Sequence, residues 1–297
     1  MLDLTARRVP TWRESLRTLR IAAWLGWQIE GNWADPFAFF IFTILRPMAT
    51  ALMLVVMYQV VAGPGRGDFF AYLFISNAFF VVVVQTMAGM AWVILDDREE
   101  YRMLKYIYTS PARKFAYLVG RATAKILIGL LTTLILLGTG ALFLGLPVHL
   151  DRVAWGWLAV YFPLGLVILI SLGLVLAGVA LVSARHGENI GEVSAGMLLL
   201  FSSAYFPPDI LPPILQQLSL ALPVTYWLEG MRRALNGGVL QGPTGPISPI
   251  LAGFDNGQLL AVLGASAIVC AGGSFLFYRW IENRARDQGI LDQTTEH

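Results

Sequence analysis

The sequence contains a single cysteine, Cys270, and only three histidines among its 297 residues. One cysteine excludes an intramolecular disulfide, and a zinc cluster would need ligands that the chain lacks, so we expect no metal site. Charged residues are also scarce, at 13% of the chain against roughly 25% in soluble domains. With 57% apolar residues, a soluble globule of this composition would be short of polar surface.

Three further features are absent, and each absence limits the classes of function that the sequence allows. The N-terminus has no short apolar segment followed by a small-residue cleavage site, so we expect the first apolar span to stay in the mature protein. No G-x-x-x-x-G-K-[ST] motif is present, and the glycine-rich run from Gly63 to Gly67 lacks the lysine and hydroxyl that hold nucleotide phosphates. If the protein uses ATP, another chain must bind it. The net charge of +2 is too small to indicate a nucleic-acid partner.

What the chain does contain is a series of apolar stretches, most of them reaching the roughly 20 residues that a helix needs to cross a bilayer. They predict an all-α, polytopic membrane protein with six transmembrane helices in a permease-like domain of residues 35–283, followed by a tail of residues 284–297. The six predicted spans are Asp35–Ala62, Phe69–Leu95, Phe115–Leu146, Val153–Ser183, Ile190–Tyr205 and Gln258–Ile281.

The N-terminal segment, residues 1–34, predicts an amphipathic helix between Trp12 and Trp33 that lies in the membrane interface. Its basic residues share one helical stripe and its apolar residues another: Arg13, Arg17 and Arg20 on the first, Leu16, Leu19, Ala23 and Trp27 on the second. Basic side chains at that depth meet lipid headgroups while the indoles reach the acyl boundary. An ordinary surface helix remains the alternative.

A proline-rich segment separates the fifth and sixth predicted spans. Two apolar stretches within residues 209–236, Ile210–Leu222 and Val224–Leu235, are each too short to span. Because backbone inside a bilayer must satisfy its hydrogen bonds, they predict two short re-entrant helices packed against the bundle. Glu229 and Arg232 are spaced i, i+3 on the second of these helices and are expected to pair, as a structural pair in preference to a substrate contact.

Lysine and arginine counts in the loops predict the orientation. With the N-terminus inside, the cytoplasmic segments carry 14 basic residues and the opposite side carries four. We therefore expect both termini to be cytoplasmic in a multi-pass protein of the plasma membrane, the inner membrane of a bacterium.

The most charged internal segment, DDREEYRMLKYIYTSPARK, runs from Asp96 to Lys114 between the second and third spans. Apolar and basic residues alternate at helical spacing, so an amphipathic helix ending near Thr109 is expected, because Pro111 disfavours helix at Ser110. Such a helix suits docking into a groove of a soluble partner. A helix that lies among headgroups without a partner is the alternative.

At this segment the chain resembles the membrane subunits of type-2 ATP-binding-cassette (ABC) exporters. The resemblance is carried by motifs that occur in the family's order over most of the chain: Arg98-Glu99, an apolar stretch, Ser110-Pro111, Gly120-Arg121, FPPDILP from Phe206 and LPVTYWLEGMR from Leu222. One departure is Tyr101-Arg102, where a Gly-Thr pair often stands in the family.

The resemblance implies a permease that pairs with a second copy or a related chain and with two cytosolic ATPase subunits, which bind ATP and magnesium. This chain itself would hold no cofactor. By similarity, a coupling helix within residues 96–110, centred on Asp97 to Lys105, contacts the ATPase, and the loop around Glu188 makes a second contact. The residues implied in coupling are Asp97, Arg98, Glu99, Glu100, Arg102, Lys105 and Glu188.

Polar residues inside spans are candidates for the transport path or the subunit interface. Arg46, Tyr58 and Gln85 are of this kind, although for Arg46 we expect snorkelling to the headgroups or a structural ion pair in preference to such a role. Spans this apolar favour an amphipathic substrate, such as a drug, a lipid or a lipid-linked glycan.

Two other classes of function compete with the exporter. An ion-coupled carrier or channel usually needs carboxylates or a polar lining within spans, whereas the acidic residues here lie at span ends. An intramembrane hydrolase needs a nucleophile and a base, but no histidine lies within a predicted span and no G-x-S-x-G or H-E-x-x-H motif occurs. We therefore expect no catalytic residue in this chain.

Overall fold

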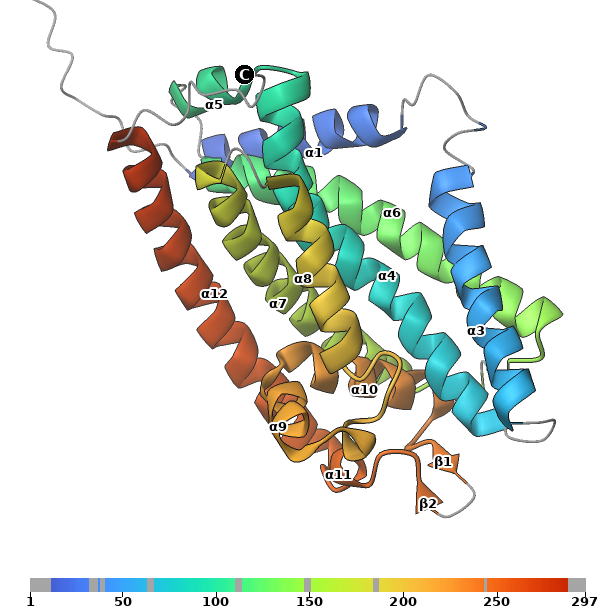
Figure 1. Ribbon diagram of the computed structural model, residues 1–297. Coiled ribbons are helices and arrows are strands. Elements are labelled where there is room, and N and C mark those ends of the chain that lie inside the picture. The colour runs from blue at the N-terminus through green and yellow to red at the C-terminus, as the bar shows by residue number, and fades with distance from the viewer. Residues whose placement is uncertain are drawn as a thin grey trace, which may run out of the picture.

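The fold of the protein was analysed in a computed structural model, which describes residues 12–31, 37, 41–62, 67–109, 114–146, 151–183, 187–242 and 245–287. The described residues form helices almost throughout (Figure 1). Four are long and apolar enough to cross a membrane, which confirms a polytopic, helical membrane protein. They are α4 (Gly67–Leu95), α6 (Lys114–Phe143), α7 (Trp155–Val182) and α12 (Asn256–Asp287).

The first and fifth predicted spans correspond to shorter helices. A five-residue π-helix, η1 (Ile41–Leu45), leads directly into the 17-residue α3 (Arg46–Ala62), and α8 (Gly187–Phe201) has 15 residues. The fifth span was expected to continue to Tyr205, but the helix stops at Phe201. Ser203 adopts a left-handed conformation with φ of 63°, which a continuing α-helix does not allow. Six crossings therefore remain a prediction.

The helices alternate in direction between two ends of the bundle (Figure 1). At one, which we call the α1 end, α1 (Trp12–Gly31) lies across the bundle, and α5 (Leu104–Thr109) and the last turns of α12 lie at this same end. The helix predicted from Trp12 is thus present, and its place in the membrane interface stays a prediction. A glycine allows α1 to pack closely on α6, because a Cβ on Gly120 of α6 would lie only 2.6 Å from the carbonyl oxygen of Leu19 in α1.

The opposite end is closed by a cap, residues 208–252, that joins α8 to α12. It comprises η3 (Pro208–Ile210), α9 (Pro213–Ala221), α10 (Pro223–Asn236), the two-residue strands β1 (Gln241–Gly242) and β2 (Gly245–Pro246), and α11 (Pro249–Ala252). The strands are antiparallel, with Gln241 opposite Pro246. The two short helices expected within residues 209–236 are therefore present as α9 and α10. Their entry into a bilayer remains a prediction.

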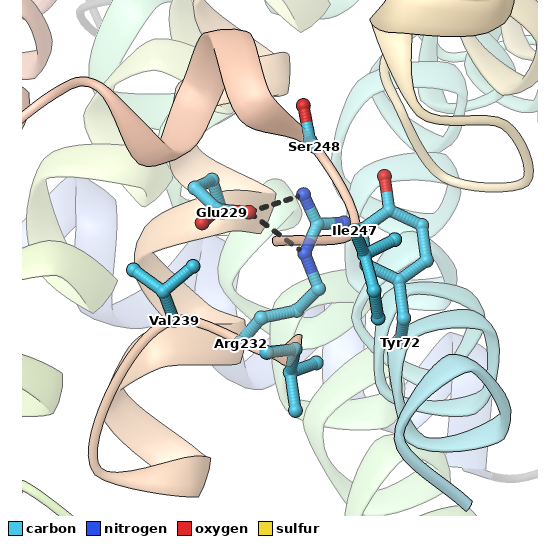
Figure 2. Close-up of a pocket in the computed structure, with 7 residues that line it drawn as sticks. Tyr72, Glu229, Arg232, Val239, Ile247 and Ser248 are labelled. Carbon is cyan, nitrogen blue, oxygen red and sulfur yellow. Dashed lines mark hydrogen bonds and ion pairs between the residues drawn. The ribbon is translucent and has the colours of Figure 1, made fainter. Parts of the chain in front are cut away.

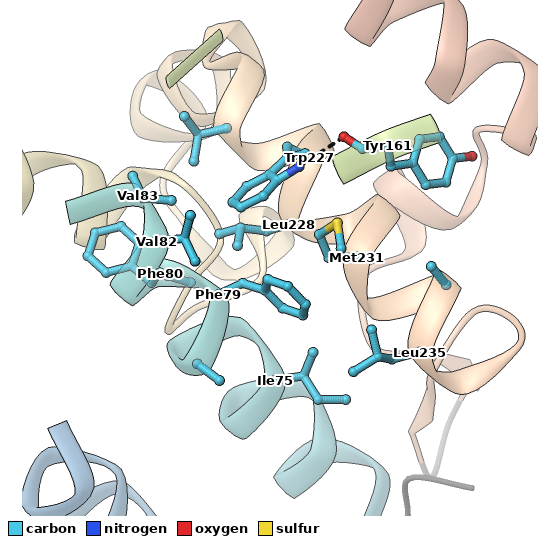
Figure 3. Close-up of a cluster of buried hydrophobic side chains, with 14 of the residues drawn as sticks. Ile75, Phe79, Phe80, Val82, Val83, Tyr161, Trp227, Leu228, Met231 and Leu235 are labelled. Carbon is cyan, nitrogen blue, oxygen red and sulfur yellow. Dashed lines mark hydrogen bonds between the residues drawn. The ribbon is translucent and has the colours of Figure 1, made fainter. Parts of the chain in front are cut away.

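The core lies where α4 and α10 meet α7 (Figure 3). Trp227 of α10 is 1% exposed, and its indole Nε1 donates a hydrogen bond to the carbonyl oxygen of Tyr161, 3.1 Å away. A Cβ on Gly165 would lie 1.9 Å from that nitrogen, so the indole fits only because position 165 lacks a side chain. Phe79 of α4 meets the Trp227 ring edge-on at 6.0 Å. This contact fixes the cap to the membrane helices.

Apolar side chains also cover much of the outer surface of the bundle. Leu134 and Leu142 on α6, and Ile268 and Val269 on α12, are between 65% and 80% exposed. Exposed apolar surfaces of this extent promote aggregation in water, whereas they suit contact with the hydrocarbon chains of a bilayer.

Candidate functional site

The predicted docking segment is built differently from the single helix expected over Asp97 to Lys105. Helix α4 continues into a π-helix, η2 (Asp96–Glu100), the chain turns at Tyr101 to Met103, and α5 begins only at Leu104. Arg102 has a φ of 49°, which breaks the helix, and backbone hydrogen bonds of 2.9 Å to the Asp96 and Asp97 carbonyls close the turn. Helix α5 thus begins seven residues after Asp97, where the coupling helix was expected to start, and its described residues run to Thr109.

Asp97 anchors this segment inside the bundle. Its side chain is fully buried, and its Oδ1 lies 3.6 Å from Nη2 of Arg121 on α6, which is itself 1% exposed. The Tyr117 hydroxyl donates a 2.8 Å hydrogen bond to Asp97 Oδ2. Asp97 Oδ1 and both Nη atoms of Arg121 form no hydrogen bond with any residue that the structure describes, so charge alone links them. We call Asp97, Tyr117 and Arg121 the buried anchor.

Arg98 makes a second inward attachment, to α7. Its Nη1 donates to the Ala180 carbonyl oxygen at 3.3 Å and its Nη2 donates to that of Leu181. These carbonyls belong to the last turn of α7, where a helix lacks its own donors and where a positive charge is favourable. Arg98 therefore ties η2 to the end of α7.

Apart from Leu104, which is buried in the core, the segment presents charged and aromatic side chains at the surface. Glu99 is half-buried, Glu100 and Arg102 are exposed, and Tyr106 of α5 is 73% exposed. Partial burial and the nearby carboxylates of Glu100 and Asp96 raise the pKa of Tyr101, because each disfavours the phenolate. The segment therefore presents a surface of mixed charge at the α1 end. Asp97 and Arg98 attach this segment to α6 and α7.

Other ion pairs brace the same end. Lys125 of α6 pairs with Glu30 of α1, and Lys114 Nζ lies 3.6 Å from Glu282 Oε1 of α12. The side chains of two predicted coupling residues, Lys105 and Glu188, lie outside the described residues, as do residues 184–186 of the second predicted contact loop. The anchored segment and its braces thus join the start of α6 to four other helices.

A second cluster of buried charge lies at the opposite end, on α10 (Figure 2). Glu229 and Arg232 pair as their spacing predicts, with Nη2 of Arg232 2.8 Å from Oε2 of the carboxylate. Arg233 adds a bond that the sequence analysis missed, from its Nε to Glu229 Oε1 at 2.8 Å. Burial by itself raises the pKa of Glu229, but the two guanidinium groups outweigh it and hold the pKa below its ordinary value.

The two arginines of this cluster connect the cap to its surroundings. Arg232 donates to Ser76 Oγ on α4 at 2.7 Å and to the Ser203 carbonyl oxygen at 3.0 Å, and its Cζ lies 4.1 Å from the Tyr72 ring centroid. Arg233 donates to the carbonyl oxygens of Leu251 and Phe254, each at 2.7 Å. Every polar end of the cluster is occupied, so its arrangement is that of a structural tie between the cap and α4.

The polar candidates for a transport path lie on α3 and α4. Arg46 is the first residue of α3, with an exposed side chain. Gln85 is half-buried on α4 and packs against α6. A Cβ added to Gly129 of α6 would lie 3.1 Å from the Cβ of Gln85. The side chain of Tyr58 lies outside the described residues.

Residues 19–236 match the sequence profile of the family described as ABC-2 type transporter. A probable doxorubicin resistance ABC transporter permease protein, DrrC, from two strains of Mycobacterium tuberculosis, CDC 1551 and H37Rv, is 26% identical to the chain over 203 residues. The alignment covers 65% of this chain and 71% of each relative.

Proposed function

The chain belongs to the ABC-2 type transporter family, and from this premise we propose that it is the membrane subunit of an ATP-driven exporter. Two copies, or one copy and a related chain, would form the translocation path, and two cytosolic ATPase subunits would supply the ATP and magnesium chemistry. The observation that carries the proposal is the group of surface side chains Glu99, Glu100, Arg102 and Tyr106, on a segment held by a fully buried ion pair.

A lever that transmits force must be fixed to what it moves. Asp97 is bonded to α6 through Arg121 and Tyr117, and Arg98 is bonded to the end of α7. A push on α5 is therefore passed to α4, α6 and α7 together. In the proposed mechanism, ATP binding draws the two ATPase subunits together, and this motion reaches the membrane helices through η2 and α5. Glu99, Glu100, Arg102 and Lys105 would contact the ATPase, and the loop around Glu188 would make a second contact.

The proposed topology has six crossings and both termini in the cytoplasm. The alternating directions of η1 with α3, α4, α6, α7, α8 and α12 support it (Figure 1). So does the excess of basic residues in the segments predicted to be cytoplasmic. With this orientation in a bacterial inner membrane, α5 faces the ATPase, and α9 and α10 enter the outer leaflet as a re-entrant pair.

The proposed substrate is amphipathic, a drug, a lipid or a lipid-linked glycan. The described spans are apolar, and the charged groups of the cap are engaged with one another. The relative named for doxorubicin resistance agrees with a hydrophobic cargo. Arg46, Tyr58 and Gln85 remain candidates for the path or for the interface with the second permease chain.

The test is co-purification from the native membrane after solubilisation in mild detergent, with an ATPase assay on the product. The charge reversal Glu99→Lys alters the outward surface, whereas Asn283→Lys places the same charge on an exposed position of α12 as a control. We expect a stoichiometric ATPase with the wild-type chain and with Asn283→Lys, and its loss with Glu99→Lys. A stable chain that brings no ATPase would contradict the proposal.

A further inference from the structure

Two exposed charges of opposite sign lie on the helices that flank α4. Arg46 is the first residue of α3 and Glu192 lies near the start of α8, and both side chains are exposed. Helix α4 packs against both helices, and Figure 1 shows α3 and α8 on either side of it. Neither charge forms an ion pair with any residue that the structure describes. A charge on a membrane helix is costly unless it is paired or reaches water.

Arg46 belongs to an exposed seam that runs along α3. Thr50, Met53 and Met57 follow it by four, seven and eleven residues. At 3.6 residues per turn, this spacing keeps all four within about 60° of rotation around the helix. All four side chains are exposed, Met53 by 74%. We call these four residues the α3 seam.

Glu192 begins a similar seam on α8. Gly196 and Leu200 follow it at intervals of four residues, which keeps the three within about 80° of rotation. All three are exposed, and a Cβ added to Gly196 would meet nothing within 4 Å. This face of α8 is therefore open to a partner. We call these three residues the α8 seam.

The two seams match in direction and in register. Both helical segments start at the α1 end, η1 with α3 at Ile41 and α8 at Gly187, and each charge is the sixth residue of its segment (Figure 1). Helix α3 of one chain, placed beside α8 of another in the same membrane, therefore brings the opposite charges to the same level. Four residues farther along, Thr50 comes opposite Gly196, and small residues at such a level let membrane helices approach closely.

A second copy of this chain satisfies both charges. In a two-fold dimer each copy supplies both seams, so the contact between the α3 seam and the α8 seam forms twice. We propose that two identical copies pair through these seams, with Arg46 of one copy in an ion pair with Glu192 of the other. This inference rests on the proposed function, which requires a second permease chain, and it identifies that chain as a second copy.

Lipid alone would not satisfy this surface. Acyl chains suit the apolar residues of both seams, and the negative charge of an inner leaflet attracts the guanidinium group of Arg46. The same negative charge disfavours the carboxylate of Glu192. A partner that carries both signs in the same register satisfies the two charges together.

The test uses two forms of the chain with different affinity tags, expressed together and purified from the native membrane through the first tag in mild detergent. The second tag and the ATPase subunit are measured in the product. We expect the second tag to be recovered with the wild type. When both forms carry Arg46→Glu, or both carry Glu192→Arg, like charges meet at both contacts, and recovery should fall at least about tenfold.

The decisive sample combines one form carrying Arg46→Glu with the other carrying Glu192→Arg. One contact then has the original pair and the other has the pair reversed, so recovery should return to within about threefold of the wild type. A folding defect, or an ion pair within one chain, could not be repaired by mixing. The control, Arg152→Glu in both forms, reverses an exposed charge near the cap and should leave recovery unchanged.

Unchanged recovery with the single reversals, or no repair in the mixed sample, would overturn the pairing. Recovery of the ATPase with a different membrane chain in place of the second tag would also overturn it, while the exporter proposal would stand. Recovery of the second tag without an ATPase, with repair in the mixed sample, would confirm the pairing and contradict the exporter proposal.

Discussion

Removal of Arg121 should destabilise the protein more than almost any other single change to a charged residue. Arg121→Met would leave the Asp97 carboxylate fully buried, with the Tyr117 hydroxyl as its one side-chain hydrogen-bond donor among the described residues. Breaking one side of a buried ion pair costs about 3–5 kcal/mol, because the remaining charge has lost its counter-charge. Asp97→Asn should cost a similar amount by isolating the guanidinium group of Arg121.

The double variant separates a true pair from two independent residues. With Asp97→Asn and Arg121→Met together, no charge is left buried, so the combined loss should fall at least ~2 kcal/mol short of the sum of the single losses. The assay is equilibrium unfolding in mixed detergent micelles, followed by tryptophan fluorescence, with ATPase co-purification measured on the same samples. Strictly additive losses would refute the buried anchor as a unit.

Three further predictions concern the packing of α6, the cap and the turn before α5. Gly120→Ala should lower the unfolding free energy by about 1–3 kcal/mol, since its methyl group would clash with the α1 backbone, whereas Gly138→Ala on the same helix, where nothing lies within 4 Å, should be neutral or stabilising. Thermal unfolding of the two variants compares them directly, and an equal loss would contradict the close packing of α1 on α6. Glu229→Gln should destabilise at pH 7 by leaving Arg232 and Arg233 without their carboxylate. Because the Glu229 pKa is lowered on folding, its contribution is complete above the ordinary value of 4.5 and is lost as the pH falls through the lowered value, so unfolding curves of wild type and variant should converge in acid. Arg102→Gly should stabilise the turn before α5 by about 1 kcal/mol, because glycine adopts the left-handed conformation without strain, and a lowered unfolding midpoint would show that the arginine side chain outweighs that gain.

Periodicity and length predicted the elements whose apolar pattern is long. The helices near Phe69–Leu95, Phe115–Leu146, Val153–Ser183 and Gln258–Ile281 all appear as long apolar helices. The end of α8 was not predictable in the same way, since the left-handed conformation of Ser203 is imposed by contacts: Arg232 donates to the Ser203 carbonyl oxygen from 29 residues away. Local sequence carries no signal for such a contact.

In the candidate site too, local sequence predicted some residues, whereas contacts between distant parts of the chain determine the rest. The outward residues of the docking segment could be named from their charges, and Glu229 with Arg232 from their spacing. The inward role of Asp97 could not, because its partner Arg121 lies on another helix. A weak signal was present: Arg121 falls within an apolar stretch, where an arginine needs a buried counter-charge or a route to water. Arg233, four residues after Glu229, was likewise detectable from helical spacing.

The central claim, that the α5 end receives the ATPase, is tested most directly by site-specific cross-linking. Replacing the single cysteine by Cys270→Ser allows one new cysteine at a time, Tyr106→Cys on α5 or Ile214→Cys on α9, which are 73% and 81% exposed in the wild type. In native membranes, a short thiol-to-amine cross-linker should join the ATPase subunit to position 106 and not to position 214. A cross-link from position 214, or none from position 106 in a complex that still contains the ATPase, would contradict the account.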